Sequence, residues 1–447
     1  MADTIAAIST APMKSAIGVI RVSGDDALNI AKKVFLGDLS TPRMMSTGKL
    51  IASGGEVCDY GMGVFFKGPK SFTGEDSVEL YCHGSTAVLR TILSSLYSAG
   101  ARPAAPGEFT QRAFLNGKLD LTQAEAIIDL IDSETELAAK NAAEQMNGTL
   151  GKEISALSDS LTAIAAEFYA FVDYPDDEIE QSERDDISEK LFTLAKHAKQ
   201  LAGSYDKGRL FREGVRVALI GRPNVGKSSL LNALLGSERS IVTDIEGTTR
   251  DTVEESLRVN SLALHLIDTA GLREADNEPE RLGIARSEAA AKNADIVIAV
   301  FDGSAPLDEF DKRALELAKK TRSICVINKS DLGCTIDKSV FSKLQVMEIS
   351  AKERIGTDAL LDRICEIFEI SDIPCDGKTV TNPRHASTLM RAYERISAAA
   401  EAFRGGIYAD IAVSDIEHAI NILGEITGRS AQDAIVSEIF SRFCVGK

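Results

Sequence analysis

The sequence predicts a multidomain fold class that combines α/β parts with an all-α part. The chain has 447 residues, a length that corresponds to roughly two to four domains. Short β-rich runs alternate with helical spacing of apolar residues in 1–118 and 214–374, whereas 119–213 and 375–447 show helical spacing without strands. We therefore expect an N-terminal α/β domain, a helical domain in two parts, and a second α/β domain inserted at 214–374.

The N-terminal segment is predicted to be α/β because strand-like and helix-like runs alternate along it. We expect strands at 4–9, 17–22, 63–66 and 78–82, helices at 25–35 and 85–98, and an irregular turn around 103–107. No second metal-type residue stands at ligand spacing from His83. We therefore interpret His83 as a packed or capping residue rather than a metal ligand.

Apolar residues recur every three or four positions through the two predicted helical parts. The clearest stripes are Ile154, Leu157, Leu161, Ile164 and Phe168, then Ile187, Leu191, Leu194, Ala198 and Leu201, and later Leu389, Tyr393, Ile396, Ala400 and Phe403. A Thr-Gln-Ala-Glu run at 122–125 predicts a capping box at the start of the first helix. Because the ends of a compact domain usually lie close together, we hypothesise one helical domain, 119–213 plus 375–447, interrupted by the inserted domain.

The inserted domain begins with a strand, a glycine-rich loop and a helix. The loop is Gly-Arg-Pro-Asn-Val-Gly-Lys-Ser at 221–228, between a β-rich run at 215–220 and helical spacing at 229–235. Its glycines let backbone N–H groups turn onto an anion, and the helix start adds partial positive charge. Lys227 is placed to reach the β- and γ-phosphates, and Ser228 to hold Mg²⁺.

Four further motifs follow the phosphate loop in the order that a GTPase requires. They are Gly-Thr-Thr at 247–249, Asp-Thr-Ala-Gly at 268–271, Asn-Lys-Ser-Asp at 328–331 and Ser-Ala-Lys at 350–352. The last three end strand-like runs, and Asp331 can accept hydrogen bonds from N1 and N2 of guanine, which adenine cannot offer. We therefore predict a Ras-like, doubly wound P-loop GTPase domain with its nucleotide at the carboxyl ends of the strands.

The predicted GTP site combines these motifs with their neighbours. Its residues are Asn224, Val225, Gly226, Lys227, Ser228, Ser229, Thr243, Asp244, Ile245, Glu246, Gly247, Thr248, Thr249, Asp268, Thr269, Ala270, Gly271, Asn328, Lys329, Asp331, Ser350, Ala351 and Lys352. Leu272 occupies the position where Ras-type enzymes have the glutamine that orients water. Another group must therefore orient water, and the acids at 274–280 are candidates. Oxygen atoms of Asn224 and of the 240–249 loop suit a monovalent cation that could supply charge in place of an arginine finger.

Composition and charge exclude several classes of protein. The formal net charge of −17 argues against indiscriminate binding of nucleic acid, which depends on Lys and Arg neutralising phosphate. Seven cysteines without a C-x-x-C pair favour a reducing compartment without disulfides or structural zinc. We expect a cytoplasmic protein, because no signal peptide is evident and no apolar run approaches the ~20 residues that span a bilayer.

Several short segments spread along the chain form a recognisable set. They are Ile-Arg-Val-Ser-Gly at 20–24, Ser-Phe-Thr-Gly-Glu-Asp at 71–76, Pro-Gly-Glu-Phe at 106–109, 112–121, 221–230, 268–273 and Phe-Cys-Val-Gly-Lys at 443–447. Through these segments the chain resembles, over essentially its full length, the MnmE (TrmE) family of bacterial tRNA-modification GTPases. The resemblance implies an N-terminal folate-binding domain that forms a homodimer. Carried over by position, Arg21, Glu79, Lys118 and Lys447 would contact 5-formyl- or 5,10-methylene-tetrahydrofolate.

The resemblance also implies a K⁺-activated GTPase with Mg²⁺. Ser228 and Thr249 would hold Mg²⁺, and Glu280 would orient water beside Lys227 and Thr249. The implied K⁺ ligands are Asn224, Thr243, Ile245 and Thr248. With the flavoprotein MnmG, such an enzyme would add a carboxymethylaminomethyl or aminomethyl group to C5 of the wobble uridine of tRNA.

Two questions stay open at this level. Whether Cys444 has a direct chemical role is one of them. The other is the class of function, because the GTPase motifs fit equally well a switch that assembles RNA or ribosomal particles without group transfer.

Overall fold

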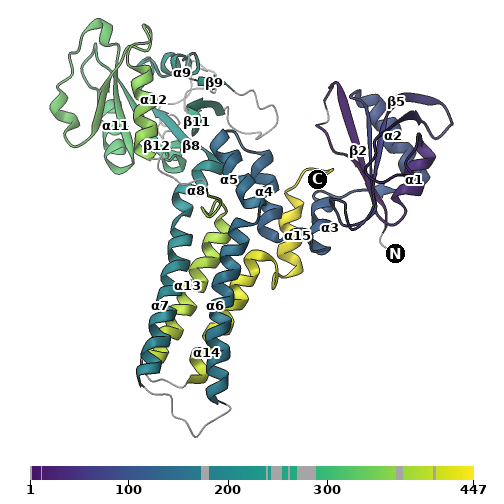
Figure 1. The fold of residues 1–447 in the computed structure, drawn as a ribbon. Helices are drawn as coiled ribbons and strands as arrows, with labels where there is room; N and C mark the ends of the chain where they lie inside the picture. Colours follow the sequence, from purple (N-terminus) through teal and green to yellow (C-terminus); the bar gives the residue numbers. More distant parts are fainter. Residues whose placement is uncertain are drawn as a thin grey trace. The chain divides into compact units, whose positions relative to one another are not determined.

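The structure is a computed structural model that describes residues 3–11, 13–172, 181–237, 240–242, 254–259, 262–268, 288–368, 376–405 and 409–447. Figure 1 labels its elements. The strands are β1 (Ile5–Ile8), β2 (Ile17–Ser23), β3 (Phe35–Leu36), β4 (Ser46–Ile51), β5 (Val57–Phe66), β6 (Ser77–His83), β7 (Arg102–Pro103), β8 (Val215–Ile220), β9 (Ser240–Val242), β10 (Glu254–Val259), β11 (Leu262–Asp268), β12 (Ile296–Asp302), β13 (Ser323–Asn328) and β14 (Gln345–Glu348). The α-helices are α1 (Ala27–Val34), α2 (Thr86–Ala99), α3 (Glu108–Leu115), α4 (Leu121–Ile131), α5 (Glu136–Met146), α6 (Thr149–Val172), α7 (Gln181–Gly203), α8 (Tyr205–Glu213), α9 (Lys227–Leu235), α11 (Glu309–Lys320), α12 (Thr357–Phe368), α13 (Pro383–Arg404), α14 (Ala409–Thr427) and α15 (Asp433–Ser441). There are also two short 3₁₀ helices, η1 (Ser330–Leu332) and η2 (Lys338–Phe341).

The chain divides into two compact units. The first contains Met1–Ile128, Ala143–Lys199 and Ser387–Lys447, and the second contains Asp129–Ala142 and Gln200–Ala386. Part of the segment predicted as helical domain therefore clusters with the P-loop part of the chain. The four-part division at 118, 213 and 374 stays a prediction.

The first unit contains a seven-stranded sheet with the order β3-β4-β5-β6-β2-β1-β7. One face is covered by α1 and α2, whose apolar stripes pack on alternate residues of β2 and β6. Ile20, Val22 and Leu80 are fully buried there, as the period-two pattern of a half-covered sheet requires. The predicted strands and helices of this segment overlap β1, β2, β5, β6, α1 and α2, although β5 begins six residues before the strand predicted at 63–66. The sequence did not predict β4, because its residues Ser-Thr-Gly-Lys-Leu-Ile form no apolar run.

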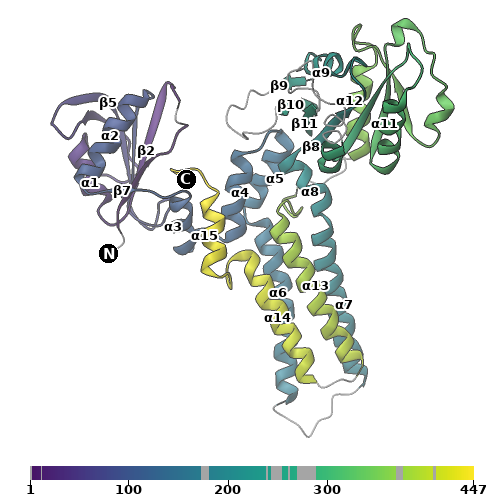
Figure 2. The same ribbon diagram turned by 180° about the vertical axis from the view of Figure 1, so that it is seen from behind.

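The helical part of the first unit joins segments from both sides of the inserted domain. Figures 1 and 2 show α6 running beside α14. The Phe168 ring meets the Phe403 ring edge-on with centroids 5.7 Å apart, and the Ser188 hydroxyl donates to the Ala400 carbonyl at 2.9 Å. These contacts agree with the apolar stripes. Within the described parts of the chain, none of the helices combines the length and apolar character needed to cross a bilayer.

The predicted capping box at 122–125 is wrong by two residues. The helix α4 begins at Leu121, and Asp120 accepts the Gln123 backbone N–H at 2.9 Å, while the Gln123 side chain accepts the Asp120 N–H at 3.0 Å. Thr122 and Glu125 are both buried on the helix. The residues 120–123 and 122–125 both have the spacing of a capping box. Thr122 is buried within the helix, so Asp120 caps it instead.

The second unit contains a seven-stranded sheet with the order β14-β13-β12-β8-β11-β10-β9. Five strands from β14 to β11 are parallel, and β10 and β9 continue antiparallel. One face packs on α9 and α12 and the other on α11, so both faces are covered. All seven residues of β12 are buried, as expected for a strand covered on both sides. The predicted fold class, with a doubly wound α/β sheet, is confirmed.

The position of β8 determines where a ligand would bind to this sheet. The strands that follow β8 in the chain, β9 to β11, lie on one side of it, and the later strands β12 to β14 lie on the other side. The strand order therefore reverses at β8. In open α/β sheets, ligands bind outside the carboxyl ends of the strands at such a reversal. The glycine-rich loop 221–228 follows β8 directly.

Candidate functional site

The loop between β8 and α9 has the backbone conformation of a phosphate cradle. Gly221 and Gly226 have φ angles of 147° and 96°, and Asn224 has a φ of 65°, a value that asparagine tolerates better than most residues. A Cβ atom at Gly226 would lie 2.3 Å from Nδ2 of Asn328. Glycine is therefore required at 226 for two reasons, the left-handed backbone and the close approach of Asn328.

Lys227 is held at the centre of this loop. Its side chain is largely buried, and its ammonium group donates to the carbonyl oxygens of Gly221 at 2.8 Å and Arg222 at 2.9 Å. Ser228 and Ser229, in the first turn of α9, are exposed. The loop thus presents an ammonium group, a hydroxyl group and the positive end of a helix together. These groups are suited to bind a polyphosphate and its Mg²⁺ ion.

Asn328 joins three of the predicted motifs. It is almost fully buried, its Nδ2 donates to the Val225 carbonyl at 2.8 Å, and its Oδ1 accepts the Ala351 N–H at 3.0 Å. One side chain at the end of β13 therefore connects the phosphate loop with the Ser-Ala-Lys loop at 350–352. Lys352, the last residue of that loop, is exposed.

Asp331 presents an exposed acceptor beside this junction. The Ser350 hydroxyl donates to its Oδ1 at 2.6 Å, and this hydrogen bond holds the pKa of the Asp331 carboxyl below its usual value. The carboxylate is therefore charged at neutral pH and can only accept hydrogen bonds. This is the character needed to pair with two N–H groups of guanine.

Asp302 belongs to the same region, although the sequence did not identify it. It ends β12, and its Oδ2 lies 2.6 Å from Nζ of Lys329, while its Oδ1 accepts from the backbone and hydroxyl of Ser304. Burial opposes its ionisation, but the bonds from Lys329 and Ser304 outweigh burial and lower its pKa. The only signal in the sequence is that Asp302 ends a buried apolar run, as the predicted motif residues do.

Part of the predicted GTP site lies outside the described residues. These residues are Thr243, Asp244, Ile245, Glu246, Gly247, Thr248, Thr249, Thr269, Ala270, Gly271 and Glu280, together with Leu272. Asp268 is the last residue of β11, and its backbone pairs with Leu219 of β8, next to the phosphate loop. The assignments of individual residues to GTP, Mg²⁺ and K⁺ stay predictions.

A second group of predicted residues meets in the first unit. Arg21 on β2 and Glu79 on β6 are direct cross-strand partners, and Arg21 Nη2 lies 2.8 Å from Glu79 Oε1. The Tyr81 hydroxyl donates to the other Glu79 oxygen at 2.8 Å. Burial and this bond to Glu79 raise the pKa of Tyr81 to about 12, so the phenol stays protonated. The Arg21 guanidinium also lies 5.0 Å from the centre of the Phe72 ring.

The last residues of the chain are attached to the same region by backbone contacts. The Phe109 N–H donates to the Lys447 carbonyl at 3.2 Å, and the Ser9 hydroxyl donates to the Gly446 carbonyl at 3.1 Å. Gly446 has a φ of 100°, and a Cβ atom there would lie 2.2 Å from the Ile8 carbonyl oxygen. Glycine at 446 thus permits the segment to lie directly against the end of β1.

The four residues implied for folate do not all touch one another. Arg21 pairs with Glu79, and the Phe109 ring, 5.7 Å from the Arg21 guanidinium, connects this pair with Lys447. Lys118 donates to the Pro69 carbonyl at 2.9 Å, in the loop that also carries Phe72. Cys444 is exposed, and its carbonyl oxygen accepts the Gly107 N–H.

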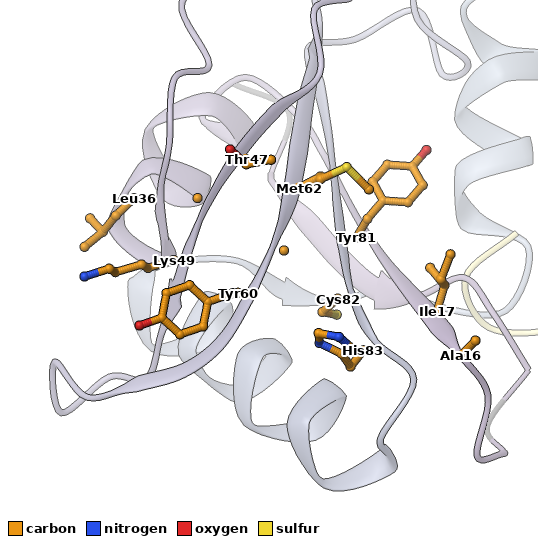
Figure 3. A pocket seen from close by; sticks show the side chains of 12 residues that line it. Ala16, Ile17, Leu36, Thr47, Lys49, Tyr60, Met62, Tyr81, Cys82 and His83 are labelled. Atoms are coloured by element: carbon orange, nitrogen blue, oxygen red, sulfur yellow. The ribbon is translucent and has the colours of Figure 1, made fainter.

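An open groove of 760 Å³ lies on the sheet face that α1 and α2 do not cover (Figure 3). Tyr60 is 64% exposed there, and Met62 lies opposite Tyr81 on the neighbouring strand. Of the two roles expected for His83, packing or capping, packing is wrong, because its side chain is 74% exposed at the end of β6. Its Nδ1 lies 2.8 Å from Oδ1 of Asp59 at the rim of the groove.

Comparison with known proteins covers the whole chain. Residues 4–118 match the family model described as GTP-binding protein TrmE N-terminus, and residues 121–444 match the MnmE helical domain. A tRNA modification GTPase MnmE from Natranaerobius thermophilus is 40% identical over 455 residues, covering 100% of this chain and 99% of the relative. A protein of the same name from Roseiflexus sp. is 41% identical over 461 residues, again covering 100% of this chain and 99% of the relative.

The comparison with solved structures adds little. The G domain of the T. maritima FeoB iron transporter covers 34% of this chain at 30% identity with a TM-score of 0.26, too low to add to the argument. The family models and the full-length relatives carry the family name that the motifs suggested. The chain therefore belongs to the MnmE family of tRNA modification GTPases.

Proposed function

We propose that this chain hydrolyses GTP and uses the cycle to modify tRNA with a one-carbon tetrahydrofolate. The proposed reaction adds a carboxymethylaminomethyl or aminomethyl group to C5 of the wobble uridine, together with the flavoprotein MnmG. The observation that carries the proposal is that the chain has, besides the P-loop unit, a cluster formed by the Arg21–Glu79 pair and the C-terminal segment. We infer that this cluster is a second site, which a simple GTPase switch would not require.

The phosphate loop fits GTP with Mg²⁺. Gly226 permits the left-handed turn of the loop and the close approach of Asn328, Lys227 is buried at the centre of the loop, and the Ser228 side chain is exposed. We assign Lys227 to the phosphates, Ser228 and Thr249 to Mg²⁺, and Glu280 to the orientation of water. Mg²⁺ would neutralise charge that develops on the phosphate oxygens during transfer.

We expect hydrolysis to depend on K⁺, which we place at oxygens of Asn224, Thr243, Ile245 and Thr248. Replacing K⁺ by Na⁺ at equal ionic strength should slow steady-state GTP turnover by about tenfold or more, since a misfitting cation supplies less charge stabilisation. The matched variant is Asn224→Gly, which keeps the φ of 65° accessible but removes the amide oxygen. This variant should lose most of the K⁺ preference. Equal turnover in both salts would remove the cation from the proposal.

The proposed folate site follows from complementary chemistry. A pterin has guanine-like N–H donors that suit a carboxylate such as Glu79, and the glutamate tail of folate is an anion that suits Arg21, Lys118 or Lys447. Glu79 already accepts hydrogen bonds from Arg21 and Tyr81, so its position is determined before any ligand arrives. These residues support the assignment that the family resemblance suggests.

The open sheet face supports a homodimer. It exposes Tyr60, Leu36 and Ile17 beside the groove, and apolar side chains gathered on one face often mark an interface. We propose that a second copy covers this face and that the assembly works in the cytoplasm with MnmG and tRNA. We also propose the division into an N-terminal folate domain, a helical domain and an inserted GTPase domain.

The composition of the wobble nucleoside in tRNA tests the proposed function. We expect tRNA from a strain without this chain to carry unmodified wobble uridine where the complemented strain carries the modified nucleoside. Mass spectrometry of digested tRNA measures the difference. An unchanged nucleoside profile would contradict the proposal and favour the alternative, a GTPase switch that acts in the assembly of RNA or ribosomal particles.

A further inference from the structure

A buried guanidinium on α3 links that helix with two other segments beside the proposed folate site. Arg112 on α3 is 8% exposed and donates to Glu75 at 3.0 Å, to Glu108 at 2.9 Å, and to the side chain and carbonyl of Asp3 at 2.7 and 2.8 Å. A charge that is removed from water is stable only when it is paired and fully hydrogen-bonded. The three segments therefore depend on Arg112 for their relative positions. No role was assigned to Arg112 from the sequence.

The first linked segment is the loop between β5 and β6, which carries Phe72. Glu75 of this loop accepts from Arg112 and from the Ser23 hydroxyl at 2.9 Å. Phe72 itself is 39% exposed, so the loop is not anchored by burial of its aromatic ring. The polar bonds of Glu75 and its neighbours determine where Phe72 lies.

Arg112 lies on α3 itself, and the first turn of this helix carries Phe109. Glu108 accepts from Arg112 and also from the Ala105 N–H at 2.8 Å. The next residue, Phe109, is fully buried, and its N–H donates to the Lys447 carbonyl. Arg112 thus reaches both the loop of Phe72 and the turn that holds the C-terminal segment.

The two aromatic rings determine the surroundings of Arg21. The Arg21 guanidinium lies 5.0 Å from the Phe72 centroid and 5.7 Å from the Phe109 centroid, distances at which a cation is attracted to an aromatic ring. A shift of either ring would change the orientation in which Arg21 meets Glu79. We propose that Arg112 is a positioning residue of the folate site, which holds Phe72 and Phe109 at the spacing that orients Arg21. This inference rests on the proposed function.

The variant Arg112→Lys tests the inference with retained charge. A lysine ammonium is a single point donor and cannot replace the planar fork that serves three carboxylates at once. The matched control is Arg102→Lys, because Arg102 belongs to the same network but its hydrogen bonds in the described structure go to Asp3, Pro103 and Glu108. The control therefore disturbs the network without touching the loop of Phe72.

A fluorescence reporter measures the position of the loop without any ligand. The chain has no tryptophan, so Phe72→Trp introduces a single indole at the site. In this background we expect Arg112→Lys to shift the emission to longer wavelength and to increase quenching by acrylamide. Arg102→Lys should leave both unchanged.

Binding of 5-formyl-tetrahydrofolate, measured by titration calorimetry, provides the second readout. We expect Arg112→Lys to weaken binding about tenfold and Arg102→Lys by less than about twofold. In a Phe72→Ala background, Arg112→Lys should cause a smaller additional loss than in the unsubstituted chain, because one of the two positioned rings is already gone. If the two substitutions acted independently through a general loss of structure, their fold-losses of affinity would multiply in the double variant. That result would overturn the inference.

The remaining outcomes separate this inference from the proposed function. If the unsubstituted chain does not bind 5-formyl-tetrahydrofolate, the folate function and the inference both fail. If it binds, and Arg112→Lys leaves the indole signal and the affinity unchanged, only the inference fails. Should Arg112→Lys not fold, Glu75→Gln removes one charge of the same contact and is expected to change both readouts in the same direction.

Discussion

Lys227→Ala is expected to reduce GTP turnover by a factor on the order of 10²–10³, comparable to the loss of one preorganised donor to a transition state. Lys227 is buried at the start of α9, where its ammonium group is held by the Gly221 and Arg222 carbonyls. Alanine offers no donor to the γ-phosphate as charge develops there. Release of phosphate under saturating GTP and Mg²⁺ measures the change.

The control for this experiment is Lys319→Ala. Lys319 lies on α11 of the same unit, is 44% exposed and pairs only locally with Glu316, so its removal should leave turnover unchanged. Thermal unfolding of both variants shows whether the fold is kept. Turnover of Lys227→Ala within about tenfold of the unsubstituted chain would contradict the assignment of Lys227 to the phosphates.

Asp331→Asn is expected to weaken GTP binding on the order of 10⁴-fold and to create a preference for xanthosine triphosphate. The Asp331 carboxylate can only accept, and guanine offers two N–H donors on its N1 and N2 edge. Asparagine turns one acceptor into a donor, which leaves a guanine donor unpaired and suits the C2 carbonyl of xanthine. A site built around hydrogen bonds rejects the mismatched partner by 10⁴–10⁵-fold, which sets the magnitude.

Fluorescent guanine and xanthine nucleotides measure the two affinities in parallel. The control is Asp337→Asn in the same unit, since Asp337 is exposed and its hydrogen bonds come from Ser339 at the start of η2. This control should keep the preference for guanine. If Asp331→Asn retained the guanine preference, base recognition would have to be assigned to another group.

Local sequence order was sufficient to predict the P-loop unit. Buried parallel strands are continuous apolar runs, and the loop 221–228 needs glycine at fixed positions whatever surrounds it. The motifs at 328–331 and 350–352 end such runs, so their meeting at one sheet edge follows from the α/β topology. The structure confirms this meeting through Asn328, which contacts both the phosphate loop and Ala351.

Other features could not be predicted, because the sequence allows more than one local arrangement and only the packing of the folded chain selects between them. Asp120 and Thr122 both have a capping partner three residues later, and packing buries Thr122 while Asp120 caps α4. His83 is exposed because it ends β6, which no spacing of residues in the sequence reveals. Asp302 and Lys329 form an ion pair because β12 and β13 are neighbours in the sheet, and the order of strands in the sheet is decided by the tertiary structure.

The amino-acid sequence alone therefore determined the class of fold, the nucleotide chemistry of the second unit and the family to which the chain belongs. These depend on short motifs and on the period of apolar residues, which are local properties. Only the tertiary structure decided how Arg21 meets Glu79, how Gly446 and Lys447 lie against β1 and α3, and that Arg112 connects Asp3, Glu75 and Glu108. Apart from the bond between Arg112 and Glu108 on one helix, these contacts join residues far apart in the chain. Their partners are selected by burial and by the need of each buried charge for a counter-charge.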